Sequence, residues 1–325
     1  MHAIVARSLG PPEVLAYVTL PDPAPGPGEI LVRVHAAGVN FADTERRRGL
    51  YQQVTLPWIP GDEGAGVVEA LGPGVDRAWL GRRVAFWAPA TSGSYAELAV
   101  VRADGLFELL DGLDFATAAA LPEQGLTAYG LAHRATSLPP GATALVHAAA
   151  GGVGALLVQL LRLRGVRVLG TASSPAKQAV VRQLGAEALD YGDGLLERVR
   201  EATGGRGVDA VFDSVGRPTQ ATSLASLAPY GRLVFFGDAG GRPEPVDPDA
   251  LYGRNLSVSA WLLPADPVGS WEVARGQLQD WVVSGALRVI VGQVFPLAEA
   301  AEAHRQLESR STHGKLILRP AGAGA

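Results

Sequence analysis

The chain has 325 residues, 47% of them hydrophobic, and at about 150 residues per domain this length indicates two domains with sizeable cores, which excludes global disorder. A formal net charge of −4 argues against a protein that binds nucleic acid non-specifically, because such proteins are basic. Cysteine is absent, which excludes disulfides, thiolate zinc sites, iron–sulfur clusters and a cysteine nucleophile.

The sequence shows neither a signal peptide nor a membrane span. Its N-terminus lacks the apolar core of a signal peptide. The longest apolar stretch, residues 145–161, contains His147, Gln159 and three glycines, and falls short of the roughly 20 apolar residues that a membrane helix needs. We therefore expect a cytoplasmic protein with no membrane partner.

Residues 1 to about 120 are predicted to form short strands joined by turns. Strand-like segments occur at residues 30–36, 64–72, 81–86 and 95–101. The chain has 41 glycines among 325 residues, well above the usual level of roughly 7%, and such a composition suits tight turns. This spacing of strands predicts a small barrel or a strongly bent sheet.

The pattern changes near residue 115, where residues 115–132 are predicted to be helical with an interruption at Leu121-Pro122. From there strands and helices alternate. Six strands are predicted, at residues 144–147, 166–171, 188–190, 208–212, 232–236 and 255–262. The helices between them are predicted at residues 152–164, 175–184, 195–202 and 220–227. This alternation predicts a doubly wound parallel sheet, and a helix at 270–284 and a strand at 315–318 complete the chain.

A glycine-rich segment, residues 147–154 (HAAAGGVG), lies between the first of these strands and the helix that follows it. Dinucleotide-binding folds carry the pattern G-x-G-x-x-G in this position. Here Ala149 takes the place of the first glycine, while Gly151 would let backbone N–H groups approach a pyrophosphate and Gly154 would permit close helix–strand packing. The segment predicts a nucleotide site, and the alternative interpretation is a purely structural tight turn.

The tip of the second strand favours NADPH over NADH. An NAD site places an acidic residue about 20 residues after the glycine loop, on the ribose 2′-hydroxyl. This chain has Ala172 there, followed by Ser173, Ser174 and Lys177, whose hydroxyl and ammonium groups can bind a 2′-phosphate. Tyr191, after the third strand, could add another hydroxyl. The alternative for Lys177, one of only two lysines, is a solvated helix-face residue.

Several motifs make the chain resemble the medium-chain dehydrogenase/reductase superfamily, and within it the zinc-independent quinone oxidoreductase (zeta-crystallin-like) branch. They are Pro25–Val34, Ala36–Asp43, Gly61–Val68, Gly125–Tyr129, Ala148–Gly154, Asp213–Gly216 and Gly314-Lys315. The resemblance implies an α/β chain with a discontinuous GroES-like, β-rich catalytic domain, residues 1–123 and 264–325. A doubly wound Rossmann domain that binds NADPH, residues 124–263, would be inserted between them, with the nicotinamide in the cleft.

The resemblance also implies roles for single residues. Asn40, Asp43 and Tyr51 would line the cleft as catalytic residues, with Tyr51 donating a hydrogen bond or proton to the acceptor and Asn40 orienting the ring or substrate. The alternative for Tyr51 is simple packing. The residues expected to contact the cofactor, besides those at the strand tip, are Thr127, Gly151, Gly152, Val153, Gly154, Ser214, Phe236, Gly237, and Lys315 or Arg310 at the pyrophosphate.

Zinc-dependent members of this superfamily carry a cysteine where Asn40 stands, a histidine where Asp62 stands and a cysteine near Glu123. Asparagine is a poor zinc ligand. An oxygen-rich site formed by Asp62, Glu63 and Glu123 is conceivable, but the first two are predicted to be turn and supporting residues. We therefore predict no metal.

Without a metal, hydrogen bonds have to polarise the acceptor, and electron-poor acceptors need the least help. We predict an NADPH-dependent reductase of quinones or quinone-like small molecules. One alternative is an enoyl or 2-alkenal reductase, which reduces a C=C bond. Another is an NADPH-binding regulatory or structural protein with little catalysis.

Two further predictions concern surfaces. The run Glu45-Arg46-Arg47-Arg48 replaces a tyrosine and an apolar residue that are frequent in the family at the first two positions. It is predicted to be either a solvated helix end or a cationic rim that admits anionic acceptors. The strand at residues 255–262 is predicted to be a sheet edge that pairs with its twin in a homodimer.

Overall fold

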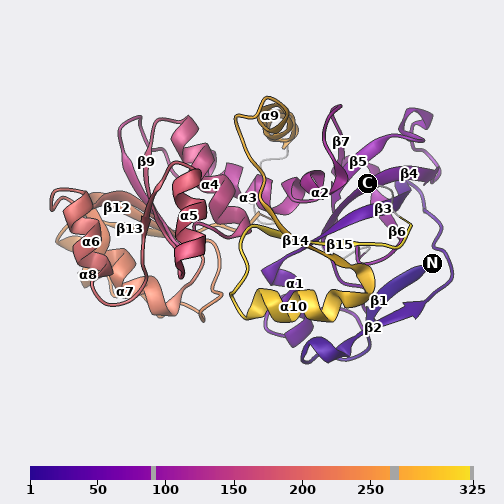
Figure 1. The fold of residues 1–325 in the computed structure, drawn as a ribbon, viewed down its shortest axis with the longest axis horizontal. Coiled ribbons are helices and arrows are strands. Elements are labelled where there is room, and N and C mark those ends of the chain that lie inside the picture. The colour runs from indigo at the N-terminus through magenta and orange to yellow at the C-terminus, as the bar shows by residue number, and fades with distance from the viewer. Residues whose placement is uncertain (89–92, 264–270, 323–325) are drawn as a thin grey trace. The chain divides into compact units, whose positions relative to one another are not determined.

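The computed structural model describes residues 1–88, 93–263 and 271–322, and the chain forms two compact units (Figure 1). The first unit comprises Met1–Gln124 and Glu272–Ala325, and the second comprises Gly125–Trp271. The second unit is therefore inserted into the sequence of the first.

The first unit is built on a strongly bent sheet of seven strands, in the order β14-β15-β3-β4-β5-β7 with β6 paired to β3. Its strands are β3 (Glu29–Val39), β4 (Glu63–Leu71), β5 (Arg83–Trp87), β6 (Leu98–Arg102), β7 (Leu106–Glu108), β14 (Val291–Pro296) and β15 (Lys315–Arg319). β1 (His2–Ala6) and β2 (Leu15–Thr19) form a separate hairpin. Ile30, Val32 and Val34 alternate along β3 into the core, and shifts of register against β4 bend this long strand.

Among its described residues, this unit has the α-helices α1 (Phe41–Arg48), α2 (Phe115–Ala118), α9 (Glu272–Val283) and α10 (Ala300–Glu308). The C-terminal segment, yellow in Figure 1, returns to the indigo N-terminal part. β15 pairs with β3 so that Leu316 lies opposite Val39, and α10 packs against α1. This return brings Lys315 next to the start of α1.

The second unit is a six-stranded sheet in the order β10-β9-β8-β11-β12-β13, with all neighbours parallel. Its strands are β8 (Thr143–Val146), β9 (Arg167–Thr171), β10 (Glu187–Leu189), β11 (Val208–Asp213), β12 (Leu227–Phe235) and β13 (Ser257–Ala260). Its helices are α3 (Leu126–Gly130), α4 (Gly152–Leu163), α5 (Pro175–Gln183), α6 (Leu195–Ala202), α7 (Arg217–Ser226) and α8 (Asp249–Tyr252). The prediction of a doubly wound parallel sheet is confirmed.

The strand order of this sheet reverses between β8 and β11. Right-handed crossovers then place α4 and α5 on one face of the sheet and α6 and α7, which pack together, on the other. In doubly wound folds the ligand binds at the carboxyl ends of the strands at such a reversal. The glycine-rich segment follows β8 at this point.

Helix α1 has no predicted counterpart among the elements delimited from the sequence, where residues 45–48 alone are interpreted as either a helix end or a cationic rim. Its buried positions are Asp43, Thr44, Arg46 and Arg47. A helix is predicted from apolar residues that recur every three to four positions. The buried face of α1 carries polar and charged residues instead, so this signal is missing. β14 and α10 are likewise not predicted.

Two observations concern the exterior. Within residues 1–88, 93–263 and 271–322, none of the helices has the length and apolar character that crossing a bilayer demands.

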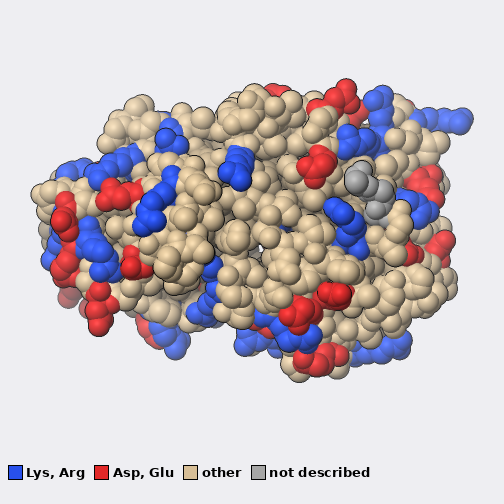
Figure 2. All heavy atoms as spheres, in the orientation of Figure 1, with Lys and Arg blue, Asp and Glu red and all other residues tan. Residues whose placement is uncertain are grey.

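On the face drawn in Figure 2, basic and acidic side chains of the described residues are intermixed.

Candidate functional site

The glycine-rich segment forms a tight turn from β8 into α4. Ala148 adopts a left-handed conformation with φ of 50°, and its carbonyl accepts a hydrogen bond of 2.8 Å from the Gly151 N–H. A Cβ on Gly154 would stand 2.3 Å from the same carbonyl oxygen, so only glycine allows this approach. No side chain caps the N-terminus of α4, and its first backbone N–H groups are therefore donors suited to an anion.

The tip of β9 carries the residues expected to recognise a 2′-phosphate. Ser174 caps α5, and its hydroxyl accepts a bond of 3.3 Å from the Lys177 N–H. Ser173 is exposed and Lys177 is half-buried, and burial lowers the pKa of the Lys177 ammonium. The Tyr191 hydroxyl accepts a bond of 2.6 Å from the Ala148 N–H and so supports the glycine turn.

A buried polar chain, which sequence reasoning does not reveal, ties together the carboxyl ends of three strands. His147 Nδ1 lies 3.1 Å from Thr171 Oγ1 and its Nε2 lies 2.9 Å from Ser223 Oγ. The Ser223 hydroxyl donates to Asp213 Oδ2 at 2.8 Å, and Thr219 donates to the same carboxylate. Burial lowers the pKa of His147, although the Asp213 carboxylate opposes the shift. A neutral imidazole therefore holds the turn that precedes α4.

The structure brings Ser214, Phe236 and Gly237 together beside this chain. The Asp213 carboxylate accepts bonds from the backbone N–H groups of Val215 and Gly216, which shapes the turn that contains Ser214. The Phe236 N–H donates to the Asp213 carbonyl at 2.9 Å. A Cβ on Gly237 would lie 3.2 Å from the Ser214 carbonyl oxygen.

Thr127 lies apart from this group in sequence, on α3, and is half-buried. Arg310 follows α10 in the first unit, is exposed and has a left-handed φ of 57°.

In the first unit a second buried cluster surrounds Asn40, the residue that precedes α1. Asn40 Nδ2 donates to Glu63 Oε1 at 2.7 Å and to Glu123 Oε2 at 2.9 Å. Asn40 Oδ1 accepts from Lys315 Nζ at 2.6 Å and from Gln124 Nε2 at 3.1 Å. Lys315, which is 1% exposed, also pairs with the Glu63 carboxylate.

The placement of Lys315 and Glu123 bears on what each group can do. Lys315 is expected to reach a pyrophosphate, whereas in the structure its ammonium is bonded to Asn40 and Glu63. Burial, reinforced by the Asp62 and Glu63 carboxylates, raises the pKa of Glu123 far above its usual range. The surroundings of Glu123 therefore favour the protonated form of its carboxyl group.

The residues of the cluster do not fit a zinc ion. The Asn40 oxygen and the Glu63 carboxylate are bonded to the Lys315 ammonium, which is itself the cation of the cluster. Asp62 is bonded to Arg46 instead, with 2.5 Å between Oδ2 and Nη1. Among the described residues no group of three or more His, Cys, Asp or Glu could hold a metal ion.

The charged run at the end of α1 corrects a prediction. Arg46 and Arg47 are 2% and 1% exposed, so neither a solvated helix end nor a cationic rim describes them, and only Arg48 is exposed. The reason is tertiary, because Asp62 and Glu308, distant in sequence, lie opposite these two guanidinium groups. Buried charges of this kind are stable only when they are paired.

Arg46 connects the cluster to Tyr51. Its guanidinium carbon lies 5.1 Å from the centre of the Tyr51 ring, within the range of a cation–π contact. Its Nη2 also donates to Gln52 Oε1 at 3.1 Å. Burial raises the pKa of the half-buried Tyr51 phenol, and the positive charge of Arg46 opposes this shift.

Asp43 is the third residue expected to be catalytic, and it is fully buried. Its Oδ2 accepts bonds from the Asn40 N–H at 3.0 Å and from the Tyr95 hydroxyl at 3.2 Å. The Tyr95 hydroxyl also lies 3.1 Å from His304 Nε2. Burial, with a contribution from Asp62, raises the pKa of Asp43 to about 7. Tyr95 and His304 come from other elements, and no local pattern marks them.

Comparison with known proteins relates the chain to two families. Residues 26–111 match the alcohol dehydrogenase GroES-like domain, and residues 184–318 match the zinc-binding dehydrogenase family. The chain is 41% identical to a quinone oxidoreductase of Pseudomonas aeruginosa over 319 residues, which cover 96% of this chain and 97% of the relative. It is 35% identical over 334 residues to a 2-haloacrylate reductase of a Burkholderia species, with 98% of each chain covered.

Solved structures give the same relation. The Escherichia coli quinone oxidoreductase complexed with NADPH superposes with a TM-score of 0.94 at 35% identity, over 98% of this chain and 100% of the other. A mycobacterial protein complexed with NADPH superposes with a TM-score of 0.92 at 40% identity, again over 98% and 100%.

Proposed function

The chain belongs to the quinone oxidoreductase branch of the medium-chain dehydrogenase/reductase superfamily, and from that premise we propose that it is an NADPH-dependent reductase of quinones or quinone-like acceptors. One observation carries the proposal. A glycine turn stands where the strand order of the parallel sheet reverses, and the next strand ends in two serines and a lysine where an NAD site would have a carboxylate.

The second unit has groups that suit each part of the cofactor. In our proposal the N-terminus of α4, with Gly151 to Gly154, binds the diphosphate. Ser173, Ser174 and Lys177 bind the 2′-phosphate, and Thr127, Ser214, Phe236 and Gly237 contact the nicotinamide half. Tyr191 and the His147 chain hold the glycine turn in shape. When bound, NADPH supplies the hydride.

The first unit supplies the groups that act on the acceptor. Reduction of a quinone adds one hydride and one proton, so a donor is needed where negative charge develops on oxygen. We assign this hydrogen bond to the Tyr51 hydroxyl, whose ring the buried Arg46 orients. Asn40 is fixed by bonds to Lys315, Glu63 and Glu123, and with Asp43 beside it would position the acceptor or the ring. Lys315 and Arg310 remain candidates for the pyrophosphate.

We also propose that the reaction needs no zinc. The support is chemical, because the Asn40 oxygen already accepts a bond from the Lys315 ammonium group and burial raises the pKa of the Glu123 carboxyl group. Activity is expected to persist after dialysis against a strong chelator. A stoichiometric metal in the purified protein, with activity lost on its removal and restored by zinc, would overturn this part of the proposal.

A second candidate function is reduction of a C=C bond conjugated to a carbonyl or carboxylate. It is favoured by the similarity to the 2-haloacrylate reductase, which extends over 98% of both chains. Hydride transfer to an enone or acrylate uses the same cofactor and the same donor for the developing charge.

The test is oxidation of NADPH, followed by the absorbance of the reduced nicotinamide, against a panel of quinones, 2-alkenals and 2-haloacrylates. Turnover of quinones supports the first candidate, and turnover of alkenals or haloacrylates alone replaces it with the second. Binding of NADPH without turnover of any acceptor points to a nucleotide-binding regulatory protein. Calorimetry that detects neither NADPH nor NADH binding would reject the whole assignment.

A homodimer through β13 is proposed as well. β13 is at the edge of its sheet, and Ser257, Ser259 and Ala260 on it are exposed. Location in the cytoplasm stays a prediction from the sequence.

A further inference from the structure

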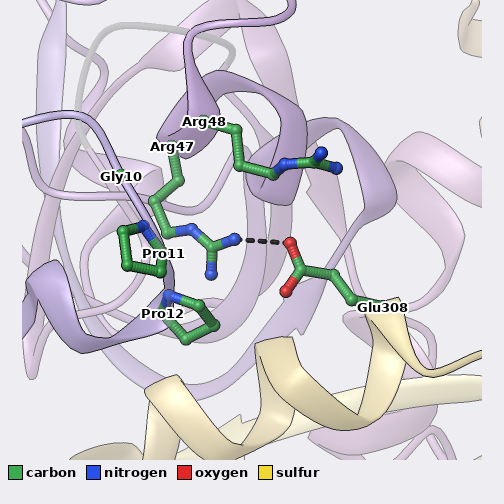
Figure 3. Close-up of a pocket in the computed structure, with 6 residues that line it drawn as sticks. All are labelled: Gly10, Pro11, Pro12, Arg47, Arg48 and Glu308. Atoms are coloured by element: carbon green, nitrogen blue, oxygen red, sulfur yellow. Dashed lines mark hydrogen bonds and ion pairs between the residues drawn. The ribbon is translucent and has the colours of Figure 1, made fainter.

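A hollow on the first unit has no part in the proposed reaction. It is lined by Gly10, Pro11, Pro12, Arg47, Arg48 and Glu308 and has a volume of about 510 Å³ (Figure 3). Sites for small ligands commonly measure about 300–1,000 Å³. We propose that this hollow binds a small monocarboxylate with an apolar body, and that Arg47 is the group that binds the carboxylate.

Arg47 is the first reason. Its guanidinium is buried, and one terminal nitrogen, Nη2, donates to the Glu308 carboxylate. Its Nε and Nη1 are also buried, and neither has a hydrogen-bond partner among the described residues. In Figure 3 the second terminal nitrogen points between Pro12 and Glu308. Buried charged donors without acceptors are costly, so an added acceptor is favoured here.

The charge balance of the hollow is the second reason. Two guanidinium groups, Arg47 and Arg48, face one carboxylate, Glu308, which leaves a net charge of +1. The nearby Glu13 carboxylate shares Arg305 with Glu302, at 2.8 Å each, and neither acidic residue lines the hollow. A ligand with a single negative charge therefore neutralises the hollow. A dianion such as inorganic phosphate would leave it with a net negative charge.

Glu308 shows which chemistry the site accepts. A carboxylate already occupies one side of the Arg47 guanidinium, and the Glu308 side chain is 22% exposed, so it can move aside or share the guanidinium with a second carboxylate. The opposite wall is Pro11 and Pro12, whose rings are apolar and rigid. A flat carboxylate such as benzoate fits both sides of the hollow, because its carboxylate can bind the guanidinium of Arg47 and its ring can pack on the two prolines.

The first experiment titrates the full-length protein with benzoate and with its neutral counterpart benzamide, by calorimetry and by thermal unfolding. We expect benzoate to bind at least about tenfold more tightly than benzamide, as charge-assisted bonds are stronger than neutral ones. Benzoate and benzamide that bind equally, or benzoate that does not bind at millimolar concentration, would overturn the proposal.

Two variants with opposite expected effects locate the site. Arg48→Ala, at an exposed position, is expected to weaken benzoate binding several-fold. Glu308→Gln removes the competing carboxylate and is expected to tighten it by about tenfold. Arg82→Ala and Glu108→Gln, in an exposed ion pair of the same unit, are the matched controls and should change nothing. Arg47→Met should abolish benzoate binding. If this variant does not fold, Arg48→Ala and Glu308→Gln still test whether benzoate binds in the hollow.

The proposal is independent of the reductase activity, and the titration is repeated with saturating NADPH to show this. Unchanged benzoate affinity supports a separate site. Two results together would refute the proposal that benzoate binds in the hollow. They are competition between benzoate and the acceptor, and a benzoate affinity that neither Arg48→Ala nor Glu308→Gln alters. Benzoate would then bind in the reaction site.

Discussion

Arg46 joins the carboxylate of Asp62 to the amide of Gln52 and the ring of Tyr51. Breaking a buried ion pair leaves one charge without a partner, which costs about 3–5 kcal/mol. Arg46→Met is expected to lower the free energy of unfolding by this amount in urea titration. Adding Asp62→Asn should recover part of the loss.

Arg48→Met is the control for that experiment, because Arg48 is exposed and lies two residues further along α1. Surface charges contribute about 1 kcal/mol or less. A cost for Arg46→Met no larger than for Arg48→Met would contradict the account of a buried pair.

Asp43 makes stability depend on pH in a predictable direction. Its pKa is raised from 3.8 to about 7 by burial, so the folded protein holds a proton that the unfolded chain releases. The stabilisation by this proton is complete below about pH 4 and is lost as the pH rises to about 7. Relative to Asp43→Asn, the wild-type protein should lose unfolding free energy across that window, measured by urea unfolding at several pH values. A difference that is constant with pH would contradict the shift.

Lys177 is the residue on which the choice of cofactor depends. A charge-assisted hydrogen bond contributes about 1.5–3 kcal/mol, so Lys177→Ala should weaken NADPH binding by about 10- to 100-fold and leave NADH binding almost unchanged. Calorimetry with both cofactors measures this. Arg182→Ala, an exposed change on the same helix, serves as the control. Equal losses for the two cofactors would refute the 2′-phosphate contact.

At the scale of elements, the turn from β8 to α4 depends on close approach. A methyl group at Gly154 would meet the Ala148 carbonyl oxygen at 2.3 Å, and relieving such overpacking costs about 1–3 kcal/mol. Gly154→Ala is therefore expected to lower the melting temperature and to weaken NADPH binding. Gly276→Ala on α9, where a Cβ meets nothing within 4 Å, should instead stabilise the protein by up to about 1 kcal/mol. Equal effects of the two changes would rule out the steric argument.

At the scale of the whole molecule, the edge strand β13 predicts association. We expect light scattering to give twice the chain mass of 33.7 kDa. Ser257→Glu combined with Ser259→Glu places like charges opposite each other across a two-fold axis and should give monomers. Ser284→Glu, exposed on the first unit, should not. A monomeric wild-type protein at micromolar concentration would refute the interface.

Local pattern determines much of this molecule. Apolar periodicity and turn residues predict the six strands, the helices between them and the glycine turn after β8, since these depend on residues close in sequence. Their regular alternation then predicts the parallel sheet. The hydroxyl and ammonium groups at the tip of β9 are likewise adjacent in sequence.

Tertiary structure alone decides the rest. Lys315 reaches Asn40, 275 positions away in the sequence, because β15 pairs with β3. Arg46 and Arg47 are buried because Asp62 and Glu308 meet them, although a run of charges by itself predicts a solvated surface. The topology of the fold determines which distant charges pair, and these pairs cannot be predicted from the residues adjacent in sequence. The sequence by itself therefore specifies the nucleotide fold, and the folded chain decides which polar groups are neutralised and which can act.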